Sequence, residues 1–294
     1  MNQANQEETQ NLLIWLERQG YAEATIKTTK IKLTQFLNWL ERETLSNLND
    51  LNMTHIENYN HYLQKRKTKK GTLLHPTTIK NHQELLKQID KYQQKTQNNK
   101  PLIKHLIPPS KTKSNPITLT KEEIQNLYKA TENTLLGYRD RAMLSLYYGC
   151  GLRRQEVENL EQKDINYSTK TLHITKSKTY RNRYIPMSNG VQKDILRYQK
   201  YSRPYLTIPK SDHLLLSQKT GKTLKGNSQL NRLKHLAQKA NLATPITLHN
   251  LRHTIATHLL KDGMPLEKIR QFLGHQSLDS TQHYTQIYQG ILML

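Results

Sequence analysis

The segment that most constrains the fold is LIPPSKTKSNPITLT, residues 106–120, because it interrupts two stretches of regular hydrophobic patterning. It is rich in proline, serine and lysine, and its apolar residues have no periodic spacing, which is typical of an interdomain linker. A chain of 294 residues is long enough for two ordinary domains. We therefore predict one domain over residues 1–106, a linker over 107–118 and a second domain over 119–294.

The first domain is predicted to be helical throughout. In TIKTTKIKLTQFLNWLERE, residues 25–43, apolar side chains recur at helical spacing at Ile26, Leu33, Leu37 and Leu40. A second predicted helix, NMTHIENYNHYLQKRKTKKG, runs into a cluster of basic residues. Pro76 opens a third helix, in a first-turn position that proline tolerates.

The second domain is predicted to be mostly helical with a small β-sheet. Thr120 and Glu123 have the spacing of a capping box at a helix start. The apolar run RDRAMLSLYYGCGL is a predicted helix that ends at Gly149 and Gly151. The short runs TLHIT and RYIPM flank a polar, cationic tip, which indicates a β-hairpin. The fold class is therefore mainly α with a small β-sheet.

The charge balance predicts a polyanionic partner. Lys plus Arg total 45 against 23 Asp plus Glu, a formal net charge of +22. Such an imbalance attracts nucleic acid, and a membrane surface is the alternative, although no basic amphipathic helix with a strong apolar face stands out. Binding should weaken with salt, with a slope of about −0.9 for each phosphate neutralised.

Composition also bears on location. No apolar run is long enough to span a bilayer, and the N-terminus MNQANQEETQ lacks the pattern of a secretory signal. The single cysteine, Cys150, excludes an internal disulfide and a cysteine-based zinc site. We expect a cytoplasmic, nucleoid-associated protein without a membrane partner.

One basic cluster follows the second predicted helix. A solvated helix end is the simpler interpretation, but the net charge favours contact with DNA phosphates. Its members are Lys65, Arg66, Lys67, Lys69 and Lys70.

Three motifs in the second domain bring together cations, imidazoles and a phenol. GLRRQE places Arg153 after a double-glycine turn at a helix start, where an anion is favoured, although a plain surface arginine is the alternative. HNLRH places His249 and Arg252 three residues apart on one helical face. In LGHQSLDSTQHYTQIY a helix ends at a glycine, and two tyrosines one helical turn apart follow.

A metal site is the competing interpretation of the histidines. His249 and His253 have the i, i+4 spacing of a metal-binding pair. However, Arg252 would lie beside the cation, and the motif lacks carboxylate or cysteine ligands. We expect neither a metal nor a cofactor.

In order and spacing, GLRRQE, HNLRHTIATHLL and LGHQSLDSTQHY resemble the motifs of the tyrosine site-specific recombinases, the phage-integrase and Xer-type family. TIKTTKIKLTQFLNWL and the hairpin KSKTYRNRYIP fit the same family, so the resemblance covers nearly the whole chain. It implies an N-terminal helical core-binding (SAM-like) domain, a C-terminal α+β catalytic domain, and a C-shaped clamp around duplex DNA.

The resemblance also implies roles for single residues. The nucleophilic tyrosine of the family follows the histidine of the Leu-Gly-His motif by nine residues, which selects Tyr284, after His275, over Tyr288. Arg153 and Arg252 match the phosphate-binding arginines, and His249 and His275 match the two active-site histidines. Glu156 is expected to orient an arginine rather than to act as a base.

The hairpin matches the family less closely. Lys178 has the family spacing to Arg183 and Pro186 and is the expected general acid, but Ser177 and Thr179 replace the flanking glycines. Lys176 is the alternative. We expect Lys176, Arg181 and Arg183 to contact DNA.

The implied function is site-specific recombination through a 3′-phosphotyrosyl intermediate and a Holliday junction, for integration and excision or for dimer or cointegrate resolution. The implied partners are double-stranded DNA with an inverted-repeat site and a homotetramer on two sites, with accessory proteins in some systems. A type IB topoisomerase is the alternative. We expect the apolar tail QIYQGILML to dock on a neighbouring protomer, with packing in cis as the alternative.

Overall fold

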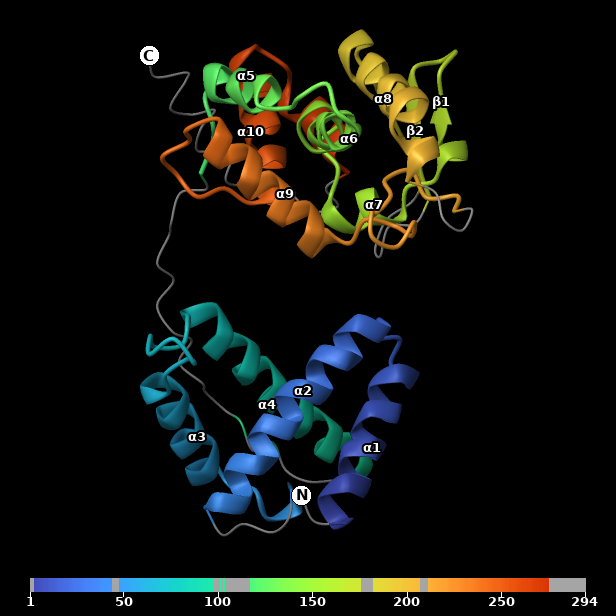
Figure 1. The fold of residues 1–294 in the computed structure, drawn as a ribbon. Coiled ribbons are helices and arrows are strands. Elements are labelled where there is room, and N and C mark those ends of the chain that lie inside the picture. The colour runs from blue at the N-terminus through green and yellow to red at the C-terminus, as the bar shows by residue number, and fades with distance from the viewer. Residues whose placement is uncertain are drawn as a thin grey trace. The chain divides into compact units, whose positions relative to one another are not determined.

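The computed structural model describes residues 3–43, 48–97, 101, 103, 117–175, 182–206 and 211–274 (Figure 1). The chain divides into two compact units, Met1–Ser114 and Asn115–Leu294. Over the described residues, helices predominate and a three-stranded sheet lies in the second unit, which confirms the predicted fold class. The exact bounds predicted for the domains and the linker stay a prediction.

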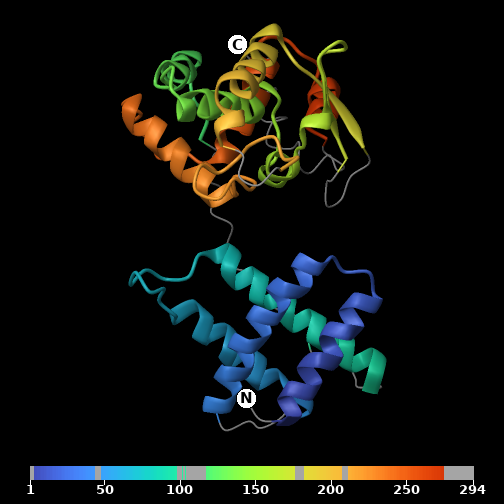
Figure 2. The ribbon, with the colours of Figure 1, turned by 45° about the vertical axis from the view of Figure 1, so that its right-hand side comes forward.

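The described part of the first unit is helical, as the apolar spacing predicted. Its elements are α1 (Gln3–Arg18), α2 (Glu23–Arg42), the short η1 (Leu48–Asp50), α3 (Met53–Lys65) and α4 (Pro76–Gln97). α2 packs against both α1 and α4, and Figures 1 and 2 show α2 and α4 crossing. Three of the predicted stripe residues, Leu33, Leu37 and Leu40, are buried, whereas Ile26 is half-buried.

An aromatic cluster closes the core of this unit. The ring of Tyr59 lies 4.6 Å from that of Phe36 and 4.9 Å from that of Trp39, measured between centroids. Tilted contacts of this kind suit the quadrupoles of aromatic rings. The core therefore joins α2 to α3 through large side chains.

The second unit has more elements. They are α5 (Lys121–Lys129), α6 (Leu135–Leu144), η2 (Ser145–Gly149), α7 (Arg154–Asn159), η3 (Gln162–Asp164), β1 (Ile165–Asn166), β2 (Thr171–Ile174), β3 (Arg183–Pro186), α8 (Asn189–Tyr201), η4 (Arg203–Tyr205), α9 (Gly226–Lys239), α10 (Leu248–Lys261) and α11 (Leu266–Leu273). α6 packs against α8, and α10 packs against η2 and α11. This packing places α10 between the glycine turn after η2 and the end of α11.

The sheet confirms the predicted hairpin. β2 and β3 are antiparallel, with Leu172 opposite Ile185 and Ile174 opposite Arg183. Leu172, Ile174 and Ile185 are buried, while His173 and Tyr184 stack on the other face with centroids 4.5 Å apart. β1 was not predicted from the sequence, because two residues with a single buried side chain give no periodic signal.

Local helix signals are confirmed in this unit. Thr120 accepts the backbone N–H of Glu123 at 3.1 Å, and Glu123 accepts that of Thr120 at 2.7 Å, completing the predicted capping box of α5. α6 continues into a π-helical turn, η2, which ends at Gly149. Gly151 follows with a φ of 59°, a conformation that favours glycine.

One face of α10 binds the segment that precedes α5, at Ile117 and Leu119. Asn250 donates to the carbonyl of Ile117 at 3.2 Å, and Thr254 accepts the N–H of Leu119 at 3.1 Å. One turn later the Nε2 atom of His258 lies 2.9 Å from the carbonyl oxygen of Leu119. The contacting positions on α10 are four residues apart and so share a face. The segment is thereby tied to the helix that carries His249 and Arg252.

Among the described residues, no helix is both long and apolar enough to cross a membrane.

Candidate active site

Glu156 is the centre of an arginine cluster in the second unit. Its side chain is only 1% exposed. Its Oε2 atom accepts the backbone N–H of Arg153 at 2.8 Å, and its Oε1 atom accepts a guanidinium N–H of the same residue at 3.1 Å. The expectation that Glu156 orients an arginine matches this geometry.

The charge state of Glu156 follows from its partners. Burial alone would raise the pKa of Glu156, but the hydrogen bonds and charges of Arg183 and Arg153 outweigh it and hold the pKa below its usual value. The carboxylate is therefore ionised at neutral pH. A proton-accepting role in catalysis would need a higher pKa, so this geometry favours orientation over base catalysis.

Arg153 and Arg252 meet at the C-terminal end of α11. Arg153 donates to the carbonyl of Gly274 at 2.8 Å, and Arg252 donates to the adjacent carbonyl of Leu273 at 2.6 Å. Arg252 also donates to the carbonyl of Gly151. The last carbonyls of a helix lack intrahelical partners and carry partial negative charge, so two cations are favoured there. Residues 121 positions apart in sequence are joined in this way.

Two glycines allow this close approach. Gly274 ends α11 in the left-handed conformation, with a φ of 64°, as predicted for the helix end. A Cβ atom at Gly151 would lie 2.9 Å from the side chain of Leu273. The turn before Arg153 therefore packs directly against the end of α11.

His249 lies on α10, one turn from Arg252. The surrounding protein, followed by the charges of Arg252 and Arg153, lowers the pKa of His249 from its usual value of 6.5. Its ring meets that of His253 edge-on, with centroids 4.3 Å apart. The imidazole of His249 is thus neutral at pH 7 and able to accept a proton.

The apolar side chains of α10 are buried to different degrees. Leu251 is fully buried, whereas Ile255 and Leu259 are half-buried. Leu248, Ala256 and Leu260 complete the buried face, together with Arg252 at 2% exposure. Arg252 can point inward because the carbonyls of Gly151 and Leu273 accept its hydrogen bonds.

Several expected site residues lie outside the described residues. Of the catalytic set these are Lys178, His275 and Tyr284. The same holds for the alternatives Lys176 and Tyr288, and for Arg181. The described residues thus bring together Arg153, His249 and Arg252, while the other assignments stay predictions.

The hairpin arginine Arg183 has a protein partner. It binds Glu156 through both terminal nitrogens, at 2.8 and 2.9 Å, and its expected contact with DNA stays a prediction. Its side chain is 12% exposed. Sequence reasoning missed this pair, because the partners lie 27 residues apart with only the hairpin pattern between them.

The basic cluster of the first unit lies on a tight turn after α3. Gly71 has a φ of 80° and donates to the carbonyl of Thr68 at 2.9 Å. Lys65, Lys67, Lys69 and Lys70 are exposed, whereas Arg66 is half-buried beside the ring of Tyr62. Four cations therefore face solvent at one end of this unit.

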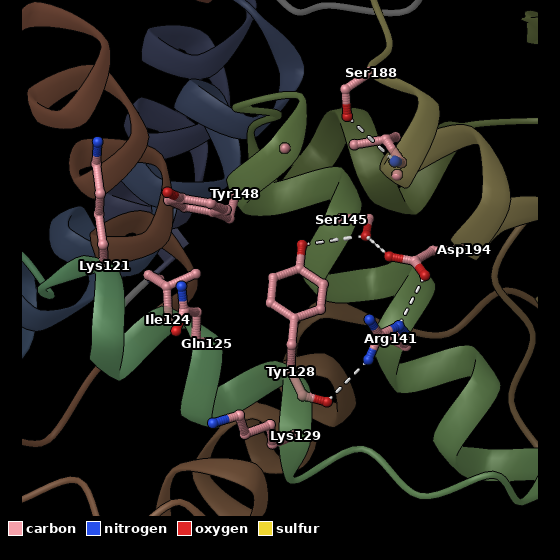
Figure 3. A pocket seen from close by; sticks show the side chains of 13 residues that line it. Lys121, Ile124, Gln125, Tyr128, Lys129, Arg141, Ser145, Tyr148, Ser188 and Asp194 are labelled. Carbon is pink, nitrogen blue, oxygen red and sulfur yellow. Dashed lines mark hydrogen bonds and ion pairs between the residues drawn. The ribbon is translucent and has the colours of Figure 1, made fainter. Parts of the chain in front are cut away.

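A separate cavity of about 590 Å³ is lined by α5, η2 and α8 (Figure 3). The Asp194 carboxylate binds Arg141 at 2.8 Å and the hydroxyl of Ser145 at 2.7 Å. Tyr128 joins this network through its hydroxyl, 3.2 Å from Ser145, and through its carbonyl, which Arg141 contacts at 3.0 Å. These polar groups satisfy one another, and Lys121, Gln125 and Lys129 also line the cavity.

Among the described residues, no group of three or more His, Cys, Asp and Glu side chains is arranged to hold a metal ion. The His249–His253 pair therefore lacks a third ligand within that part of the chain.

The chain is similar in sequence to known proteins. The chain matches the model of the phage integrase family over residues 118–290. The tyrosine recombinase XerC of Oceanobacillus iheyensis is 33% identical over 183 residues, which cover 61% of this chain and 59% of that protein. XerC of Anoxybacillus flavithermus is 28% identical over 274 residues, which cover 91% of this chain and 88% of that protein.

A solved structure has the same fold. The XerH site-specific recombinase, bound to a palindromic difH substrate in a post-cleavage complex, aligns with a TM-score of 0.73 and 21% identity. The alignment covers 99% of this chain and 87% of the XerH chain. Since the family model spans more than half of the residues and the arginine motifs fall inside it, the chain belongs to the phage integrase family, that of the tyrosine recombinases.

Proposed function

We propose that this protein is a site-specific DNA recombinase that cleaves and rejoins strands through a 3′-phosphotyrosyl intermediate and a Holliday junction. The observation that carries the proposal is the pairing of Arg153 and Arg252 on adjacent carbonyls at the end of α11. The next residue is His275, and Tyr284 follows it by nine residues. Two cations are thereby fixed at the last two described residues before the sequence that holds the expected nucleophile.

In the proposed reaction the phenolic oxygen of Tyr284 attacks the scissile phosphorus, and the bond from phosphorus to the 5′ oxygen breaks. Arg153 and Arg252 bind the non-bridging oxygens and stabilise the charge that develops there. Removing one such donor typically raises a barrier by about 2.7–4 kcal/mol. The ester energy is kept in the phosphotyrosyl bond, and the free 5′ hydroxyl can reverse the step.

Proton transfer is assigned to His249 and Lys178, and phosphate binding to His275. His249 is neutral, since its pKa is lowered, and it can accept the phenolic proton of Tyr284. Lys178 donates a proton to the leaving 5′ oxygen, and His275 hydrogen-bonds the phosphate. Free tyrosine has a pKa of about 10, so the nucleophile needs such a base near neutral pH.

DNA binding on a larger scale is proposed as follows. The first unit, with Lys65, Arg66, Lys67, Lys69 and Lys70, and the second unit close around duplex DNA as a C-shaped clamp joined by the linker. Two inverted-repeat sites are held by a homotetramer, with accessory proteins in some settings, in the cytoplasm at the nucleoid. The net charge of +22 and the recombinase–DNA complexes among the structural neighbours support a DNA partner.

A plasmid assay separates recombination from topoisomerase activity, the less favoured alternative. The inverted repeat that the protein selects from a pool of random duplexes is cloned in two copies, in one copy and in none. We expect deletion or inversion only with two copies. Relaxation of the site-free plasmid without recombination of the two-site plasmid would overturn the proposal.

A further inference from the structure

We propose that Arg183 is a positioning residue for the cleavage step, which holds Arg153 in place through Glu156 and Gly274 instead of contacting DNA. This inference rests on the proposed function and deepens it. It assigns to the hairpin strand β3 a role in the phosphate-binding site.

The carboxylate of Glu156 is shared evenly between the two arginines. Its Oε1 atom accepts one N–H from Arg153 at 3.1 Å and one from Arg183 at 2.8 Å. Its Oε2 atom accepts the backbone N–H of Arg153 at 2.8 Å and the second N–H of Arg183 at 2.9 Å. A bidentate contact fixes the plane of the carboxylate, and the carboxylate in turn fixes the orientation of the Arg153 guanidinium.

Burial distinguishes the two arginines. The side chain of Arg183 is 12% exposed, against 27% for that of Arg153. Arg183 binds Glu156 through both terminal nitrogens, whereas Arg153 binds it through one of its terminal nitrogens and the carbonyl of Gly274 through the other. Arg153 on its own would leave a carboxylate with 1% exposure short of donors, and a buried charge that lacks partners is strongly unfavourable.

A second contact joins Arg183 to the same site. A Cβ atom added at Gly274 would lie 2.9 Å from Nε of Arg183 and 3.0 Å from its Cδ and Cζ atoms. Gly274 is also the residue whose carbonyl accepts from Arg153 at 2.8 Å. Arg183 therefore packs against both groups that anchor Arg153.

Lysine cannot replace this arrangement. Its ammonium keeps the charge but offers a single point of contact, so the carboxylate plane is no longer fixed. Arg183→Lys thus separates the positioning role from simple charge balance.

The chain offers a matched control. Asp140 is also 1% exposed and bound by two arginines, since Arg232 contacts its Oδ2 atom at 2.8 and 2.6 Å, and Arg139 its Oδ1 atom at 3.3 Å. None of these three residues is in the proposed site. Arg232→Lys disturbs a similar ion cluster without touching Arg153.

The test uses the full-length protein and nicked duplexes that carry the selected inverted repeat. One duplex has an ordinary scissile phosphodiester, and the other has a methylphosphonate, which lacks the charge that Arg153 neutralises. We expect Arg183→Lys to slow adduct formation on the phosphodiester by up to about 100-fold, as small misplacements of catalytic groups do. The loss on the methylphosphonate should be much smaller, and Arg232→Lys should leave the ratio of the two rates as in the wild type.

A double-mutant comparison completes the test. If Arg183 acts through Arg153, adding Arg183→Lys to Arg153→Ala causes no further loss. Equal losses on both duplexes, additive losses in the double variant, or an unchanged phosphodiester rate would each overturn the inference. Should Arg183→Lys fail to fold, Glu156→Gln, which keeps the side-chain shape, is put through the same comparison. A wild-type protein that forms no adduct would instead refute the proposed function.

Discussion

At the scale of single residues, the candidate site is built around a buried anion rather than around the cations themselves. Glu156 fixes Arg153, and the carbonyls at the end of α11 fix both Arg153 and Arg252. Preorganised donors contribute more to catalysis than mobile ones, because they need no reorganisation during the reaction. The charge of these arginines also acts on their neighbour His249.

Arg153→Ala is expected to raise the pKa of His249. Burial and Arg252 remain in the variant, so the pKa should rise toward 6.5 without exceeding it. An NMR titration of the His249 imidazole measures the change. The folded state prefers the neutral ring of His249. The free energy of unfolding is therefore unaffected by this group above pH 6.5, and it decreases as the pH falls from 6.5 toward the lower pKa of the folded state.

Arg154→Ala is the control for this titration. Arg154 is the next residue, but it pairs with Glu158 at 2.9 Å and does not contribute to the shift of His249. Its removal should leave the midpoint in place. A lower or unchanged midpoint in Arg153→Ala would show that the charge of Arg153 does not reach the ring.

At the scale of elements, short-range signals were sufficient to predict much of the fold. The capping box of Thr120 and Glu123, the proline that opens α4 and the glycine that ends α11 are each read from a few adjacent residues. β1 was not predicted, because two residues with a single buried side chain give no periodic signal. The Arg183–Glu156 pair was not predicted, because its partners lie 27 residues apart in the sequence. Similarly, α10 was predicted from the sequence, but its contacts with Ile117 and Leu119 were not.

Thr254→Val tests how firmly α10 holds this segment. Valine has the shape of threonine but cannot accept the N–H of Leu119, which lies at 3.1 Å in a buried setting. An unsatisfied buried donor costs about 1–3 kcal/mol, so the free energy of unfolding should fall by that amount. Urea denaturation of the full-length protein, monitored by far-UV circular dichroism, gives the free energy of unfolding.

Thr257→Val is the matched control, one turn along the same helix. Its hydroxyl donates at 3.0 Å to the carbonyl of His253 in its own helix, so its loss leaves no stranded donor. We expect a change within about 0.5 kcal/mol. Equal losses in the two variants would mean that the contact with Leu119 adds nothing specific.

At the scale of the whole molecule, charge, tail and assembly act together. The net charge of +22 accounts for attraction to DNA but not for the pairing of two sites. Pairing needs contacts between protomers, and the tail, although outside the described residues, is apolar in sequence after Tyr288. We propose that it docks on a neighbouring protomer.

Deletion of residues 290–294 is expected to lower synapsis while leaving binding to a single site intact. Gel-shift assays with one-site and two-site DNA distinguish binding from pairing. Unchanged synapsis and cleavage in the deletion variant would remove the docking proposal.

The most direct test of the account is covalent trapping on a nicked duplex that carries the selected inverted repeat. Mass spectrometry of the digested adduct locates the attached nucleotide. The account predicts a 3′-phosphotyrosyl link at Tyr284 that forms in the presence of EDTA and is lost in Tyr284→Phe. An adduct at Tyr288, or none with the wild-type protein, would contradict it.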